Sequence, residues 1–248
     1  MRSDGQIDSL TFDLDSSRGR LAGEVTLTSD GLGLIGTTRF QGIEIAAFAD
    51  QVPQFAPLAP IRAPIDGRAE FEATTDGRIS RLQFDMNAGA GELVFSAFYP
   101  EPIDIAGMHL RGNIVDDMTR LRIDEASIDF GGPIATIQAS AIQIHDDVHI
   151  QLEGNVAEVS VREIDRYWPK SVAPLPRDWV VKNIVGGTFS QAHLSMTARL
   201  VDGAIDAVDI QSIDGTMKIR DASVNYLDPL PIFTNVNASA AFTADHFN

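Results

Sequence analysis

Regular alternation of apolar and polar residues is the feature that most constrains how this chain can fold. Leu10, Phe12 and Leu14 alternate with polar residues, and the pattern returns after each turn along most of the sequence. A period of two places successive side chains on opposite faces of a β-strand. Asp-Gly, a dipeptide that favours tight hairpin turns, occurs six times. No helical pattern links the strands as a parallel sheet requires, so we predict an all-β antiparallel meander.

The alternation also predicts one apolar and one polar face. The apolar face is expected to carry Leu82, Phe84, Met86, Leu93, Phe95, Met108, Leu110, Ile142, Ile144, Leu194 and Met196. A sheet with one apolar face must cover that face. The sequence shows no amphipathic helix for this purpose. A β-sandwich, a closed barrel and a sheet curled around an apolar guest all remain open.

Two stretches interrupt the alternation and are expected to form short helical connectors, near residues 44–52 and 164–184. The second holds both tryptophans, Trp168 and Trp179. Pro169 should end a short helix before it, because proline disfavours the helical conformation of the preceding residue. We expect the two tryptophans to pin this connector onto the sheet, and they are candidates to cap or line an apolar groove.

A weak internal repeat relates the two halves of the chain. Each unit begins with a proline-containing connector and continues as a run of hairpins, and the pair Tyr99 and Pro102 recurs as Tyr226 and Pro229. Modules of this kind stack end to end. We therefore predict one continuous segment over residues 1–248, made of a partial module (1–51), a full module (52–163) and a truncated module (164–248).

Charge and composition exclude several classes of function. The formal net charge of −16 argues against nucleic acid as a partner and against electrostatic docking on anionic lipid headgroups. The chain has no cysteine, hence neither disulfides nor thiolate chemistry. The polar N-terminus is no signal peptide, and no apolar run is long enough for a membrane span. The last residues read as a strand, so we expect a segment of a longer parent protein that carries the anchor elsewhere.

Motifs that could carry chemistry have simpler explanations. Residues 31–36 match the dinucleotide fingerprint GxGxxG, but strand-like residues follow where a helix is required. His145 and His149 flank what reads as a hairpin tip, so a solvated turn is favoured over a metal site. The many carboxylates offer no distinct acid–base pair, and no hydrolase, zinc-protease or phosphate-loop motif is present. We predict no enzymatic activity, no cofactor and no metal.

The chain resembles the AsmA-like envelope proteins, specifically the YhdP-type members. The matching residues are Tyr167-Trp168-Pro169, Arg177-Asp178-Trp179, Gly186-Gly187, and Asn225-Tyr226 followed by Pro229 and Ile232. The resemblance implies a long, strongly curved antiparallel meander that forms an open groove with an apolar inner face. It also implies a periplasmic segment of a parent protein that is anchored in the inner membrane by a helix and contains further repeats.

The function implied by the resemblance is transport of phospholipid or another acyl lipid, which supports lipid homeostasis of the outer membrane. The alternative is a structural or interaction module, a β-sandwich of an envelope or surface protein that holds no lipid. A β-rich hydrolase that uses the acidic residues is a third hypothesis.

Overall fold

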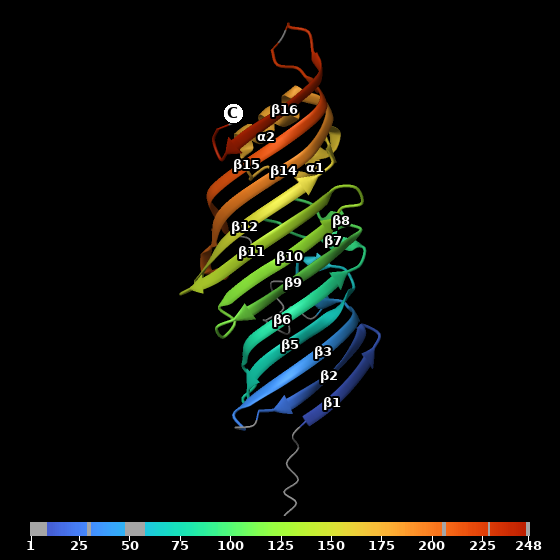
Figure 1. Cartoon of the computed structure of the whole chain (residues 1–248), viewed down its shortest axis with the longest axis vertical. Coiled ribbons are helices and arrows are strands. Elements are labelled where there is room, and N and C mark those ends of the chain that lie inside the picture. The colour runs from blue at the N-terminus through green and yellow to red at the C-terminus, as the bar shows by residue number, and fades with distance from the viewer. Residues whose placement is uncertain (1–8, 29–30, 48–57, 205–206, 228, 247–248) are drawn as a thin grey trace, which may run out of the picture.

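A single antiparallel sheet of 13 strands runs the length of the molecule (Figure 1). The computed structural model describes residues 9–28, 31–47, 58–204, 207–227 and 229–246. The strands follow one another in the sheet in the order β1 (Ser9–Ser16), β2 (Gly19–Leu27), β3 (Gly33–Ile43), β5 (Ile65–Thr74), β6 (Ile79–Ala88), β9 (Gly107–Val115), β10 (Arg120–Asp129), β11 (Ile134–Ile144), β12 (Asp147–Ala157), β14 (Ile184–Leu200), β15 (Val208–Val224) and β16 (Phe233–Thr243). The short strand β13 (Val159–Ser160) pairs with β14. The predicted meander is confirmed.

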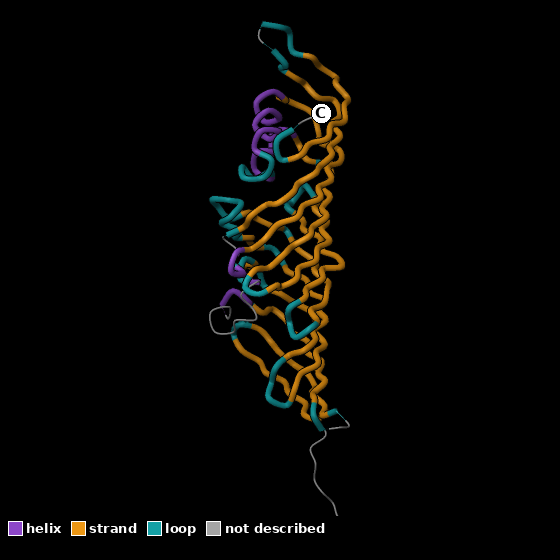
Figure 2. The backbone as a smooth tube through the Cα atoms, turned by 90° about the vertical axis from the view of Figure 1, so that its left-hand side faces the viewer, coloured by secondary structure: helices purple, strands orange, loops and turns teal. Residues whose placement is uncertain are grey.

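The sheet is elongated and is not strongly curled, so the expected strong curvature is wrong (Figure 2). Alternation determines which side chains share a face of a strand. It does not determine how far each strand rotates relative to the next, which depends on twist, bulges and the packing of each face.

Several expected breaks between strands are absent, and the strands are longer than the sequence indicates. The region 205–226 reads as three short strands, but residues 208–224 form the single strand β15. Asp66-Gly67 lies inside β5 and Asp214-Gly215 inside β15, where the dipeptides were expected to mark turns. Asp76-Gly77 does lie in a turn, and Gly77 has a φ of +87°.

The glycines inside the strands make room for aromatic rings. Five of them lie directly opposite a phenylalanine on a neighbouring strand: Gly23 opposite Phe12, Gly36 opposite Phe71, Gly67 opposite Phe40, Gly112 opposite Phe84, and Gly215 opposite Phe242. A Cβ atom at Gly215 would lie 2.1 Å from Cζ of Phe242, so the ring occupies the space above this glycine. Such cross-strand pairs fix the register of adjacent strands.

Two segments pack against the apolar face of the sheet, both on the same side (Figure 2). We call the first, residues 45–47, 58–64 and 89–106, the first cover. It contains a 3₁₀ turn, η1 (Ile45–Ala47), and a three-stranded sheet of β4 (Ile61–Arg62), β7 (Gly91–Leu93) and β8 (Ile103–Ile105). The second cover, residues 158–183, contains β13, a 3₁₀ turn η3 (Val161–Glu163), α1 (Ile164–Tyr167) and α2 (Pro174–Asn183). A further 3₁₀ turn, η4 (Val201–Gly203), joins β14 to β15.

The covers confirm the predicted helical connectors and show how the apolar face is covered. Helical turns occur in both predicted connectors, at Ile45–Ala47 and between Val161 and Asn183, whereas residues 48–52 lie outside the described part of the chain. The sequence shows no amphipathic helix that could cover the apolar face, yet the chain covers part of that face itself. The covering segments are short and irregular, so no amphipathic period reveals them in the sequence.

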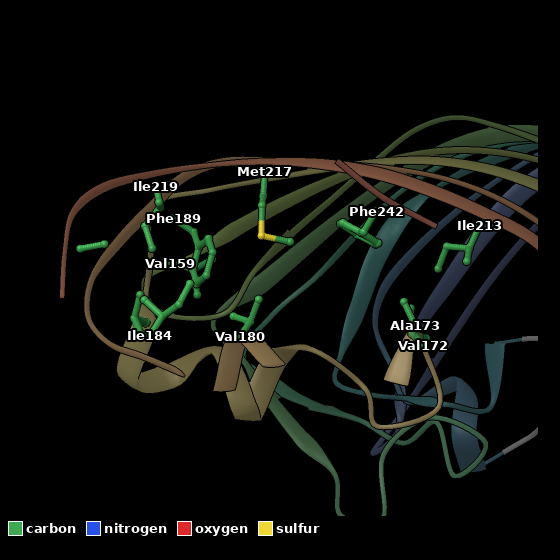
Figure 3. Packing of buried hydrophobic residues seen from close by; sticks show 12 residues of the cluster. Val159, Val172, Ala173, Val180, Ile184, Phe189, Ile213, Met217, Ile219 and Phe242 are labelled. Atoms are coloured by element: carbon green, nitrogen blue, oxygen red, sulfur yellow. The ribbon is translucent and has the colours of Figure 1, made fainter. Parts of the chain in front are cut away.

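Each cover closes a small hydrophobic core against the sheet. Under the first cover, Ile65 and Met86 of the sheet pack with Ile61, Leu93 and Ile105 of the cover. Under the second cover, Phe189 and Met217 point from the sheet toward Val180 of α2, which is fully buried (Figure 3). The described part of the chain therefore has two local cores in place of one continuous core.

Candidate functional site

A strip of apolar side chains crosses the sheet beside the two covers. In one row Phe71, Leu82, Ile114, Leu121, Ala141 and Ile150 are directly paired across six strands. In the adjacent row the paired residues are Phe84, Gly112, Ile123, Ala139, Leu152 and Met196. Directly opposed residues on one face of a sheet contact each other. The two rows therefore form one continuous apolar surface.

Phe84 packs against the first core, and the other residues of the two rows belong to neither core. The larger members of the strip are half-buried: Phe71, Leu82, Ile114, Leu121, Ile123, Ile150, Leu152 and Met196. It extends from β5 to β14, and with strands about 4.8 Å apart its length is roughly 30 Å. We call these eight residues the apolar strip.

The candidate groove residues other than Ile142 and Ile144 divide among three places. Leu82 and Met196 belong to the apolar strip. Beneath or within the first cover lie Phe84, Met86, Met108, Leu110, Leu93 and Phe95, of which Leu93 ends β7 and is buried. Leu194, Trp168 and Trp179 pack against the core of the second cover. A role for these residues in lipid binding stays a prediction.

Ile142 and Ile144 were assigned to the wrong face. In the observed register Ala139 and Ala141 lie opposite Leu152 and Ile150 of the strip, so Ile142, the next residue, points to the other face. There it lies opposite Arg120 and His149. The small residues of β11 carry too weak an apolar signal for the sequence to choose between its two faces.

Sequence reasoning did not single out Ile123, Ile150 and Leu152. All three lie in strands whose apolar and polar residues alternate regularly, so the alternation indicates which face each occupies. The alternation does not show which strands pair, and it is this pairing that places the three residues in line with Met196 and Phe84.

The second cover is held together by one buried cation. Arg177, only 4% exposed, donates from Nε to the carbonyl oxygen of Trp168 at 2.7 Å, and its guanidinium also forms an ion pair with Asp165. The indole Nε1 of Trp168 donates to the carbonyl oxygen of Val172 at 2.7 Å, and its ring packs against Phe242. As predicted, this tryptophan attaches the connector to the sheet.

The two covers touch each other through a hydrogen bond and an ion pair. The hydroxyl of Tyr99 in the first cover donates to the carbonyl oxygen of Tyr167 at the end of α1, at 2.8 Å. Burial raises the pKa of Tyr99 to about 12. Arg166 pairs with Asp104 across the same junction at 2.8 Å. The two covers are thus joined at this junction.

A cavity of about 220 Å³ lies where the covers meet the sheet. It is lined by Ala97, Phe98, Ser171, Val208 and Ile210. Ile210 is opposite Ala198, which is in turn opposite Ile150 of the apolar strip. The cavity therefore continues the first row of the strip at the β15 side.

The opposite face of the sheet is polar and carries paired charges. Asp85 lies directly opposite Arg68 on one neighbouring strand and Arg111 on the other. Its carboxylate also lies 3.0 Å from Nε2 of His109. Elsewhere, the hydrogen bond from Arg20 lowers the pKa of Asp13, and the hydroxyl of Thr74 lowers the pKa of Asp76. Both shifts favour ionised carboxylates, the opposite of what a carboxylic general acid requires.

The motifs with a possible chemical role lie in turns and strands. Gly31, with a φ of +70°, precedes β3, which begins at Gly33, so a strand and not a helix follows the glycine-rich stretch. His145 and Asp146 form the two-residue turn between β11 and β12, and His149 lies within β12. Within the described residues, no three histidine or acidic side chains are grouped as a metal site would require.

Comparison with known proteins places the chain in one family. A family model described as "YhdP protein" matches residues 4–248, nearly the whole chain. No curated protein and no solved structure matches it.

Proposed function

We propose that this chain, which belongs to the YhdP family of AsmA-like envelope proteins, shields the acyl chains of a phospholipid or similar lipid along its apolar strip. One observation carries the proposal: two rows of paired apolar residues cross seven strands, and the described parts of the covers leave the larger side chains half-buried. A contiguous apolar surface that the protein leaves partly uncovered is a feature of sites for a ligand or a partner.

The dimensions and chemistry of the strip suit an acyl chain. The acyl chains of one bilayer leaflet are about 15 Å deep, half of the roughly 30 Å hydrocarbon core, so the strip is long enough for them. Each CH₂ group that leaves water contributes about 0.8 kcal/mol. A lipid tail could therefore bind without any specific polar partner. The covers would form one wall beside the tail, with the sheet beneath it, which is the sense in which we propose a groove.

The family suggests a setting in the cell envelope, and we infer that the chain acts as a periplasmic segment of a parent protein anchored in the inner membrane. The strip would there carry lipid between the membranes and support lipid homeostasis of the outer membrane. In the part of the chain that the structure describes, no helix is long and apolar enough to cross a membrane.

The test compares the same charge on the two faces of one strand. Leu152 lies on the apolar strip, and its neighbour Gln151 is exposed on the polar face of β12. We expect purified protein to carry lipid detectable by native mass spectrometry and by extraction. Leu152→Asp should reduce bound lipid at least tenfold, because a carboxylate in the strip must be desolvated by the tail. Gln151→Asp and Leu152→Met should retain it.

A structural module without lipid cargo is the competing function, and the two covers favour it because they already bury part of the apolar face. It predicts no bound lipid in the wild type and no difference between Leu152→Asp and Gln151→Asp beyond thermal stability. That pair of results would exclude the lipid-binding proposal.

A further inference from the structure

The cavity where the covers meet the sheet is bordered by three separate parts of the chain. Ala97 and Phe98 line it from the first cover, Ser171 from the second cover, and Val208 and Ile210 from β15. Four of these side chains are apolar, and the fifth carries a small hydroxyl. No charged side chain is among the described residues that line the cavity. Walls of this composition suit a hydrocarbon ligand.

The apolar strip leads to this cavity over β12, β14 and β15. Val148 lies on the same face of β12 as Ile150 of the strip, because the two are two residues apart. Val148 is paired with Leu200 of β14, and Leu200 is paired with Val208 of the cavity wall. Val148, Leu200 and Val208 are all half-buried. A ligand on the strip can therefore extend over this row of side chains into the cavity.

The second cover closes the two rows of the strip at the same place. Met196 is paired with Ile213, which is 3% exposed beneath the second cover. Ala198, which continues the first row on β14, is 2% exposed. The row that stays open at β15 is thus the one that reaches Val208. The strip narrows from two rows to one and meets the cavity at its β15 end.

The size of the cavity suits the end of an acyl chain. Its volume is about 220 Å³. An apolar cavity of about 150 Å³ in a protein can hold benzene, so by the same ratio this cavity holds a hydrocarbon of roughly nine carbons. The acyl chains of a membrane leaflet are about 15 Å deep and exceed that size, so the rest of the tail must lie outside the cavity.

We propose that this cavity is the subsite for the methyl end of an acyl chain, and that the rest of the chain lies over Val148, Leu200 and the apolar strip. The inference rests on the proposed lipid binding and adds two properties to it. The tail stops against Phe98 and Ser171, so the lipid is held in one register and with its polar head away from β15. The volume of the cavity sets the tail length that fits best.

Photochemical cross-linking locates the two ends of a bound tail. One probe is a phosphatidylcholine whose palmitoyl chain carries a diazirine at its methyl end, and a second probe carries the diazirine beside the ester. Mass spectrometry of the irradiated protein identifies the labelled residues. We expect the methyl-end probe to label Ala97, Phe98 or Val208. The other probe should label β10 to β12, since a tail of about 15 Å spans roughly three strand spacings.

Filling the cavity should shorten the tail that binds best. Ala97→Trp places a large ring in the cavity, whereas Ser96→Trp is the matched control, because Ser96 is exposed and does not line the cavity. We expect Ala97→Trp to lose methyl-end labelling at the cavity. It should also lower binding of dipalmitoyl relative to dioctanoyl phosphatidylcholine at least fivefold in native mass spectrometry. Ser171→Phe fills the cavity from an exposed position of the second cover and should shift the preference in the same direction.

The outcomes separate this subsite from lipid binding itself. If the wild type binds lipid but methyl-end labels spread along the strip, or if neither filling variant changes the preferred tail length, the subsite is wrong and binding on the strip stands. A wild type that binds no lipid would overturn both proposals. Methyl-end labels at the cavity that disappear in Ala97→Trp and persist in Ser96→Trp would support the subsite.

Discussion

Arg177 and Trp168 are joined by a hydrogen bond of 2.7 Å from the guanidinium Nε to the backbone carbonyl oxygen, although three prolines separate them, with Trp168 directly after α1 and Arg177 inside α2. Arg177 is the only charged residue buried in the described part of the chain. Its position explains how a connector with few regular backbone hydrogen bonds can keep one conformation over the sheet. The Arg177 guanidinium, near the start of α2, forms a hydrogen bond with the backbone at the end of α1.

The first prediction concerns this cation. Arg177→Leu should lower the free energy of unfolding by about 2 kcal/mol, because the charge-assisted bond to the Trp168 carbonyl is lost and the acceptor remains half-buried. Arg162→Leu, an exposed position on the same cover, is the control and should change stability by less than about 0.5 kcal/mol. Urea denaturation followed by tryptophan fluorescence measures both. Equal effects of the two substitutions would contradict the structural role of Arg177.

The second prediction concerns the pairs of glycine and phenylalanine. Gly215→Ala should cost about 1–3 kcal/mol, because the added Cβ meets the ring of Phe242. In a Phe242→Ala background the same substitution should cost much less, so a double-mutant cycle should show coupling between the two sites. Gly132→Ala is the matched control, since no atom lies within 4 Å of a Cβ there. Additive effects would mean that the ring does not occupy the space above Gly215.

The third prediction concerns the buried hydroxyl of Tyr99. Its folded-state pKa of about 12 lies above the value of about 10 in an unfolded chain. Between these values the unfolded state loses its proton first, so this residue should lower the free energy of unfolding by about 1–3 kcal/mol as the pH rises from 10 to 12. Below pH 10 its contribution is fully present.

The comparison with Tyr99→Phe isolates this effect from the titration of other groups. The variant should be about 1 kcal/mol less stable at pH 8, because the bond to the Tyr167 carbonyl is lost. It should lose less stability than the wild type between pH 9 and pH 11. If the free energy of unfolding falls with pH equally in the two proteins, Tyr99 ionises as an exposed tyrosine does, and the prediction fails.

The fourth prediction separates the local core from the sheet edge. Phe189 is 2% exposed beneath the second cover, so Phe189→Ala should cost about 3–5 kcal/mol by loss of buried surface and creation of a cavity. Phe233, at the start of β16, is 54% exposed, and Phe233→Ala should leave thermal stability of the dilute protein nearly unchanged. A large effect at Phe233 would show that the loop before β16 is already covered in solution.

The sequence by itself determined the class of fold and the family. Side chains alternate along a strand whatever the strand packs against, so the apolar positions Leu82, Phe84, Met108, Leu110, Leu194 and Met196 could be grouped on one face from their spacing alone. Turn residues such as Gly31 and Gly77 carry their own conformational signal. The short helices in the second connector were also foreseen, because the alternation stops there and Pro169 acts on the residue before it.

Only the tertiary structure decided which residues lie side by side and what covers them. The face of Ile142 follows from the register between β11 and β12, and Gly215 lies inside β15 opposite the Phe242 ring of β16; both are contacts between separate strands. The covers are held by interactions such as Tyr99 to Tyr167 that leave no periodic trace in the sequence. Curvature of the sheet likewise follows from how all strands pack together, so local alternation could predict the faces of the sheet but not its shape.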